Sequence, residues 1–176
     1  MVARSILSLL GPLVFLGACD RDAGDDRINA TSDGAQTQKS TGNAFVIDPA
    51  TGSVSARHTD PDGATIQLEA GADLPVALPE PFTAMPDAEI LQNTRVEKGT
   101  ARLVYLDFTT DRPVDDVIAF YRGQAGGGGI VTLVDIAGDD NHTLAGENGG
   151  LALEFSISAR RSAGRTHGQL VVSKGI

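Results

Sequence analysis

The feature that most restricts the fold of this chain is the regular recurrence of turn-forming residues. From residue 44 to residue 176, clusters of Gly, Pro, Asp and Asn divide the sequence into short runs of alternating apolar and polar residues. Such runs, bounded by turn residues, are typical of strands joined by tight connections. Gly accounts for 21 of the 176 residues, or roughly 12% against a usual share of about 7%. The chain after residue 43 is therefore predicted to be mostly strand.

The clearest strand pattern places Leu151, Leu153, Phe155 and Ile157 on one face, alternating with small or polar residues. That alternation predicts a strand buried on one side. Four prolines between residues 74 and 86 exclude a helix or a central strand there, so this segment is predicted to be an extended connection. The predicted strands cover residues 45–47, 53–58, 64–68, 90–96, 101–108, 130–136, 143–145, 151–158 and 166–172.

One helix is predicted, over residues 114–125. Its apolar stripe consists of Val114, Val117, Ile118, Tyr121 and Ala125. Pro113 suits the first position of a helix, and the run 126–129 of four glycines ends it. Strands around one helix predict an α+β, two-layer fold, with a mostly antiparallel sheet and one packed helix, preceded by short N-terminal strands.

The first residues form an export signal. Arg4 provides a positive charge, residues 6–16 form a short apolar stretch, and Leu16-Gly17-Ala18-Cys19 follows. The apolar stretch is too short to span a bilayer. The pattern resembles the lipobox of bacterial lipoproteins, although an ordinary secretory signal that happens to contain a cysteine is the alternative. The resemblance implies cleavage before Cys19 and acylation of Cys19, which would anchor the protein in a membrane.

The resemblance places the protein in the cell envelope, lipid-anchored and facing the periplasm. It also implies that Asp20, directly after Cys19, favours the inner membrane over the outer membrane. Residues 20–43 are polar and acidic, and they cannot bury enough apolar surface to fold. We expect a signal peptide over 1–18, a lipidated cysteine with a disordered tether over 19–43, strand hairpins over 44–75 and an α+β domain over 76–176. The tether would reach roughly 27 Å.

A second resemblance rests on weaker motifs in the folded part. These are Val76-Ala77-Leu78-Pro79, a strand ending near Thr110, the helix start Asp111-Arg112-Pro113, and an aromatic pair at Phe120-Tyr121. The combination resembles small uncharacterised envelope lipoproteins. It implies a fold and a location, and it implies no activity.

Composition excludes several classes of function. The net charge of -9 argues against a nucleic-acid binder, and the single Cys excludes a multi-cysteine metal site. The sequence contains no His-Glu-x-x-His and no Gly-x-Ser-x-Gly motif, so we predict no cofactor, no metal and no enzymatic activity. The glycine run 126–129 comes after the predicted helix, whereas a phosphate-binding loop comes before its helix. We therefore interpret the run as a helix stop and not as a phosphate-binding loop. The segment Asp139-Asp140-Asn141-His142 is predicted to be a turn, with a metal or acid–base site as the alternative.

One basic concentration stands out on this acidic chain. Arg160 and Arg161, with Arg165 nearby, would project together from a hairpin tip and could meet anionic lipid, lipopolysaccharide or an acidic partner. Solvated side chains are the alternative interpretation. The leading functional hypothesis is a non-catalytic domain that binds an envelope protein or the cell wall. A carrier for an amphipathic ligand held between helix and sheet is the first alternative, and a hydrolase using Asp107 and Glu154 is the second.

Overall fold

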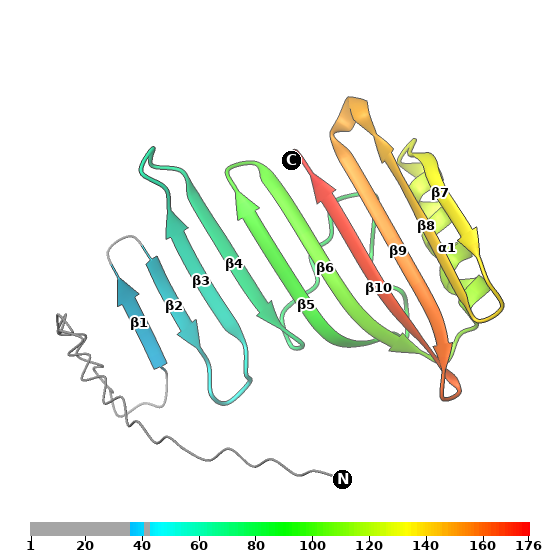
Figure 1. The fold of residues 1–176 in the computed structure, drawn as a ribbon, viewed down its shortest axis with the longest axis horizontal. Helices are drawn as coiled ribbons and strands as arrows, with labels where there is room; N and C mark the ends of the chain where they lie inside the picture. The colour runs from blue at the N-terminus through cyan, green and yellow to red at the C-terminus, as the bar shows by residue number, and fades with distance from the viewer. Residues whose placement is uncertain (1–35, 41–42) are drawn as a thin grey trace, which may run out of the picture.

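The computed structural model describes residues 36–40 and 43–176, and these form one antiparallel sheet with a single α-helix (Figure 1). Helix α1 spans Val114–Gly127, and a short 3₁₀ helix spans Gly149–Leu151. The strands are β1 Gln36–Ser40, β2 Asn43–Ile47, β3 Val54–Thr59, β4 Thr65–Gly71, β5 Glu89–Lys98, β6 Ala101–Thr110, β7 Val131–Ala137, β8 Asn141–Asn148, β9 Leu153–Ser162 and β10 Arg165–Lys174. The predicted strands are confirmed in position, with ends that differ by a few residues.

Two meanders meet in the middle of the sheet. The strand order is β1-β2-β3-β4-β5-β6-β10-β9-β8-β7, and every neighbouring pair is antiparallel. Strands β1 to β6 follow one another directly. The chain then crosses through α1 to the far edge at β7 and returns strand by strand to place β10 beside β6 (Figure 1).

Helix α1 lies behind the second meander and packs on β8 and β9. It begins at Val114, directly after Pro113, and two acidic residues in its first turn suit the positive end of the helix dipole. The predicted apolar stripe is confirmed, since Val117, Ile118, Tyr121 and Ala125 are buried. Gly128 and Gly129 end the helix by turning back onto its last carbonyls, which confirms the glycine run as a helix stop.

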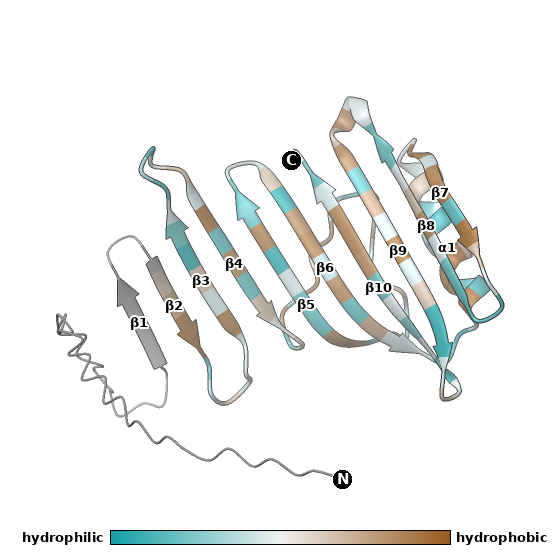
Figure 2. Cartoon of the chain, in the orientation of Figure 1, coloured by the Kyte–Doolittle hydropathy of each residue, from teal (hydrophilic) through white to brown (hydrophobic). Residues whose placement is uncertain are grey.

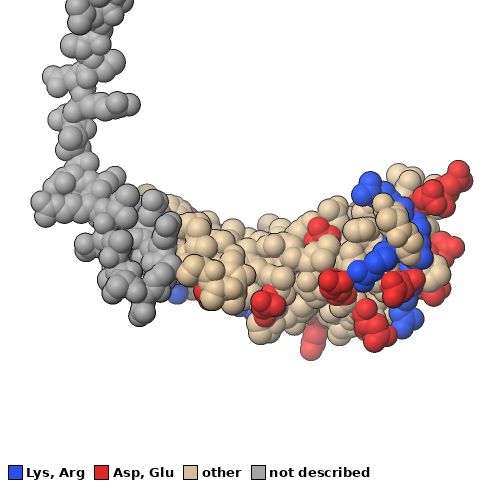
Figure 3. Space-filling view, turned by 90° about the horizontal axis from the view of Figure 1, so that it is seen from below, with Lys and Arg blue, Asp and Glu red and all other residues tan. Residues whose placement is uncertain are grey.

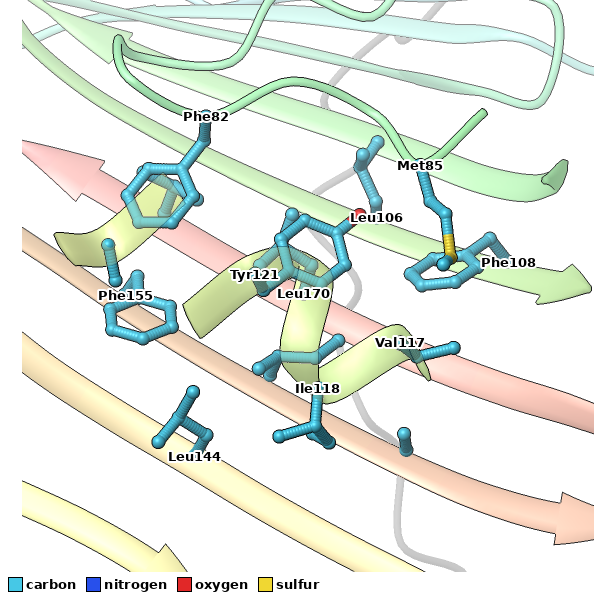
Figure 4. Close-up of a cluster of buried hydrophobic side chains, with 14 of the residues drawn as sticks. Phe82, Met85, Leu106, Phe108, Val117, Ile118, Tyr121, Leu144, Phe155 and Leu170 are labelled. Carbon is cyan, nitrogen blue, oxygen red and sulfur yellow. The ribbon is translucent and has the colours of Figure 1, made fainter. Parts of the chain in front are cut away.

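The core lies between α1, the connection 72–88 and strands β6, β10, β9 and β8 (Figure 4). Phe82 and Met85 enter it from the connection, and Phe82 stacks on Phe155 with ring centroids 5.0 Å apart. The side-chain amide of Asn93 donates to the carbonyls of Leu74 and Pro75, which holds the connection against the sheet. The core side chains from the sheet are Val104, Leu106, Phe108, Leu144, Leu153, Phe155, Ile157, Ala159, Leu170 and Val172.

The structure corrects three expectations. The fold is mostly β, with one helix covering part of a long sheet, because strands 44–71 extend that sheet instead of forming hairpins of their own. Leu151 lies in the 3₁₀ helix and is exposed, because Ala152 takes a left-handed conformation that interrupts the alternation before β9. Gln36–Ser40, inside the expected tether, forms β1. Its backbone pairs with β2, so strand pairing compensates there for the lack of apolar side chains.

Candidate functional site

The apolar side of the sheet changes between its two halves. We call the side covered by α1 the helix face and the other side the open face. On β6, Val104, Leu106 and Phe108 point to the helix face and are buried, while Leu103 and Tyr105 point to the open face. Strand register extends this division to every neighbour, so each side chain can be assigned to one face.

In β3 to β6 the helix face carries charges beyond the reach of α1. Arg95 pairs with Glu69, and Arg102 Nη2 lies 2.8 Å from Glu97 Oε1. The register places these four residues on one face, with Arg57 and Gln67 beside them. Exposed ion pairs of this kind contribute little stability, and they mark a surface that meets water.

Apolar and polar residues alternate along these strands (Figure 2), and register places eight apolar side chains of β2 to β6 together on the open face. α1 and the connection 72–88 both lie on the helix face, and nothing within residues 44–176 covers these side chains. Phe45 is 40% exposed and Ile47 is 36% exposed, while the others are half-buried by one another. We call this surface the open apolar patch, and it consists of Phe45, Ile47, Val54, Ala56, Ile66, Leu68, Val96 and Leu103.

Charge at the margin of the open apolar patch is balanced. Lys98 Nζ lies 3.2 Å from one oxygen of Asp60, and His58 Nε2 lies 2.9 Å from the other. The hydrogen bond from Lys98 is the main cause of a lowered pKa for the Asp60 carboxyl. The patch therefore presents no net positive rim at this end.

The three arginines predicted as a basic cluster lie in different surroundings. Arg161 is on the helix face, where its guanidinium donates to the carbonyls of Asp111 and Arg112 at 3.2 and 3.1 Å. Arg165 Nη1 lies 2.8 Å from Glu89, and that contact lowers the pKa of the Glu89 carboxyl. Arg160 is exposed on the open face. Adjacent strand residues point to opposite faces, so Arg160 and Arg161 cannot form one patch.

The turn predicted at Asp139-Asp140-Asn141-His142 is confirmed only for its first two residues, because Asn141 and His142 begin β8. His142 Nε2 lies 2.7 Å from Asp135 Oδ1, and Arg122 Nη2 lies 3.0 Å from Asp135 Oδ2. The hydrogen bond with His142 is the main reason why the pKa of Asp135 is lowered. These contacts tie edge strand β7 to α1 and β8. Within the described residues no group of three or more His, Cys, Asp or Glu side chains is placed to hold a metal ion.

The two carboxylates of the hydrolase hypothesis are far apart. Asp107 on β6 and Glu154 on β9 are two strands apart and offset by four residues in register. Standard sheet spacings place them roughly 16 Å apart, well beyond the separations of about 5–9.5 Å found in glycoside hydrolases.

The space required by the carrier hypothesis is filled with side chains. Tyr121, Ile118 and Val117 of α1 pack directly on the sheet (Figure 4), and Tyr121, Leu144 and Ile157 are fully buried. A shallow hollow of about 440 Å³ lies beside the helix, lined by Ile118, Ala119, Gly123 and charged side chains, and it opens to solvent. Helix and sheet therefore meet in a packed core.

Sequence reasoning missed the open apolar patch. The alternation of Phe45 with Ile47 and of Ile66 with Leu68 was visible, but only strand register shows that both pairs share a face with Leu103.

No protein-family model, curated protein or solved structure matches this chain. No helix among the described residues is long and apolar enough to cross a membrane. The export signal, Cys19 and most of the tether lie outside the described residues.

Proposed function

We propose that this protein is a lipid-anchored envelope lipoprotein whose domain binds another protein through the open apolar patch, without catalysing a reaction. The patch is the observation that carries the proposal. Antiparallel sheets usually cover one face and place polar residues on the other. Over β3 to β6 only the second condition is met: the charged face is solvated, but nothing within residues 44–176 covers the apolar face. Exposed apolar surfaces of this extent mark interaction sites.

A protein surface fits the patch better than a lipid surface does. Docking on anionic membranes depends on Lys and Arg around an apolar surface. The patch has only Lys98 at its margin, balanced by Asp60, and the whole chain carries a charge of -9. Figure 3 views the sheet from below, at its strand ends, and charged residues are most numerous there towards the β7 end of the sheet. An uncharged apolar protein surface is therefore the expected partner.

The size of the patch is consistent with a specific contact. Five strands at about 4.8 Å spacing and five to six residues of about 3.3 Å each give a footprint of roughly 400 Å². A standard interface buries about 800 Å² per partner, with an apolar centre and a polar rim. A partner that covers the patch and the polar side chains around it would reach that value.

The anchor remains a proposal based on the sequence around Cys19. Acylation there would hold the domain at the periplasmic face of a membrane, and Asp20 favours the inner one. Two or three acyl chains give stable attachment, whereas a single chain gives only marginal attachment. The partner would then be an envelope protein within reach of the tether.

Photo-crosslinking in living cells tests the binding surface. A photoreactive amino acid at Leu68, in the centre of the patch, should give a reproducible crosslinked product. The same amino acid at Gln67 is the matched control, because it lies one residue away on the opposite face. A product of equal yield from both positions, or from neither, would count against the proposal. A product of twice the monomer mass would identify a second copy as the partner.

Replacing Cys19 with Ser tests the anchor. The variant should accumulate as an unprocessed precursor and should change its partition between membrane and soluble fractions, because serine cannot form the thioether to diacylglycerol. Metabolic labelling with a fatty acid, followed by fractionation, measures both effects. Unchanged labelling and unchanged partition would show that the lipobox interpretation is wrong.

A further inference from the structure

A polar hollow lies on the open face beside the open apolar patch. Six side chains from β6, β10, β9 and β8 line it, and its volume is about 490 Å³. Register orders them in two rows. Asp107, Gln169 and Ser158 form one row, and His167, Arg160 and Asn141 form the other. Directly opposed side chains in a sheet have Cβ atoms about 5 Å apart, so the six converge on one small area.

Several polar groups of this hollow are free to bind. Among the described residues, the side chains of Asp107, Arg160 and His167 form no ion pair or hydrogen bond, whereas Arg95, Arg102, Arg122 and Arg165 are all paired with carboxylates. Asp107 and His167 are half-buried, and Arg160 and Gln169 are exposed. The hollow therefore has a polar floor and longer polar side chains around it.

Tyr105 provides an ordered ring next to the hollow. It precedes Asp107 by two residues on the same face of β6, and Gln169 Nε2 donates to its hydroxyl at 3.2 Å. Burial, and then the charge of Asp107, raise the pKa of Tyr105, so the phenol is neutral at physiological pH. The ring offers an apolar surface with a polar tip, held by a neighbour that also lines the hollow.

We propose that this hollow binds a neutral polyhydroxylated ligand, a saccharide chain. Asp107 accepts hydrogen bonds, Arg160 donates them, and the amides of Gln169 and Asn141 do both, which matches neighbouring hydroxyls that are each donor and acceptor. The Asp107 and Arg160 charges offset each other, so a phosphate or a metal cation gains no net attraction. No aliphatic side chain lines the hollow, which disfavours a peptide, whereas the apolar face of a sugar ring can pack on Tyr105.

Titration with two soluble probes tests the proposal. The full chain, purified in a detergent without a sugar headgroup, is titrated with an N-acetylglucosamine tetrasaccharide and with a glucose tetrasaccharide, and saturation-transfer NMR reports binding. At least one probe should bind saturably. Asp107→Asn should weaken that binding roughly tenfold or more, because a charge-assisted hydrogen bond is lost. The matched control Glu154→Gln, on the same face of β9 but outside the hollow, should bind as the wild type does.

Three results would overturn the proposal. They are the absence of saturable binding by either probe, binding that Asp107→Asn leaves unchanged, and preferential binding of inorganic phosphate that depends on Arg160 and His167. Circular dichroism and melting curves confirm that each variant is folded. Ala56→Glu lies opposite Leu68 in the open apolar patch. It should abolish the product crosslinked from residue 68 but leave saccharide binding intact, so the two proposals can fail independently.

Discussion

Gly168→Ala is expected to lower the melting temperature by about 10 °C. Gly168 lies on β10 opposite Phe108 of β6, and the Phe108 ring packs flat against its backbone. A Cβ at residue 168 would come within 3.0 Å of three ring carbons of Phe108, which is 1% exposed and has little room to move. Overpacking of this kind costs about 3 kcal/mol, and a domain of this size loses about 2–4 °C per kcal/mol. Calorimetry measures the change.

Gly123→Ala is the matched control. Residue 123 is exposed within α1 and a Cβ there meets nothing within 4 Å, so alanine should raise stability by about 0.5–1 kcal/mol through its better helix propensity. Phe108→Leu in the Gly168→Ala background should recover part of the loss, since the two sites share one contact. Equal melting temperatures for the wild type and Gly168→Ala would contradict the packing of Phe108.

Leu106→Ala is expected to cost about 2–5 kcal/mol of unfolding free energy, whereas Leu103→Ala should cost less than about 1 kcal/mol. Both residues lie on β6 and lose the same atoms. Leu106 is fully buried under the connection and α1, while Leu103 is only partly buried and lies on the open face. Urea denaturation of the two variants measures the difference.

The same pair of variants also tests whether the open face is free in solution. If Leu103→Ala destabilises the protein as much as Leu106→Ala, something covers the open apolar patch in the isolated protein. In that event the stability of the wild type should depend on protein concentration if the cover is a second copy.

Local features of this fold could be predicted from the sequence. The helix at 114–125 follows from its stripe and from Pro113, and the strand carrying Leu153, Phe155 and Ile157 follows from its alternation. Such patterns consist of the spacing of apolar residues within a short segment, with one side buried and the other facing solvent. They can therefore be identified in a single sequence.

Features that depend on distant partners could not be predicted. Arg161 has the same local sequence signal as Arg160, but it binds carbonyls of Asp111 and Arg112, about fifty residues earlier. The open apolar patch forms because the apolar residues of β2 to β4 point to the same face as Leu103 of β6. The register of four strand pairs determines this, and the sequence of any one strand does not. The strand order likewise depends on the pairing of β10 with β6. These strands are far apart in the sequence, and no local pattern in either one predicts that they pair.

The position of β10 affects the order in which the protein can be completed. During synthesis the strands up to β6 can pair as each one emerges, but the second edge of β6 stays open until residues 165–174 exist. Leu170 and Val172, two fully buried residues, therefore join the core only after β7 to β9 have been made. Without β10, strands β6 and β9 would lack their shared neighbour, and the core would lack Leu170 and Val172. The two meanders are joined side by side only through β10, so the central part of the sheet can form only after residue 174 has been made.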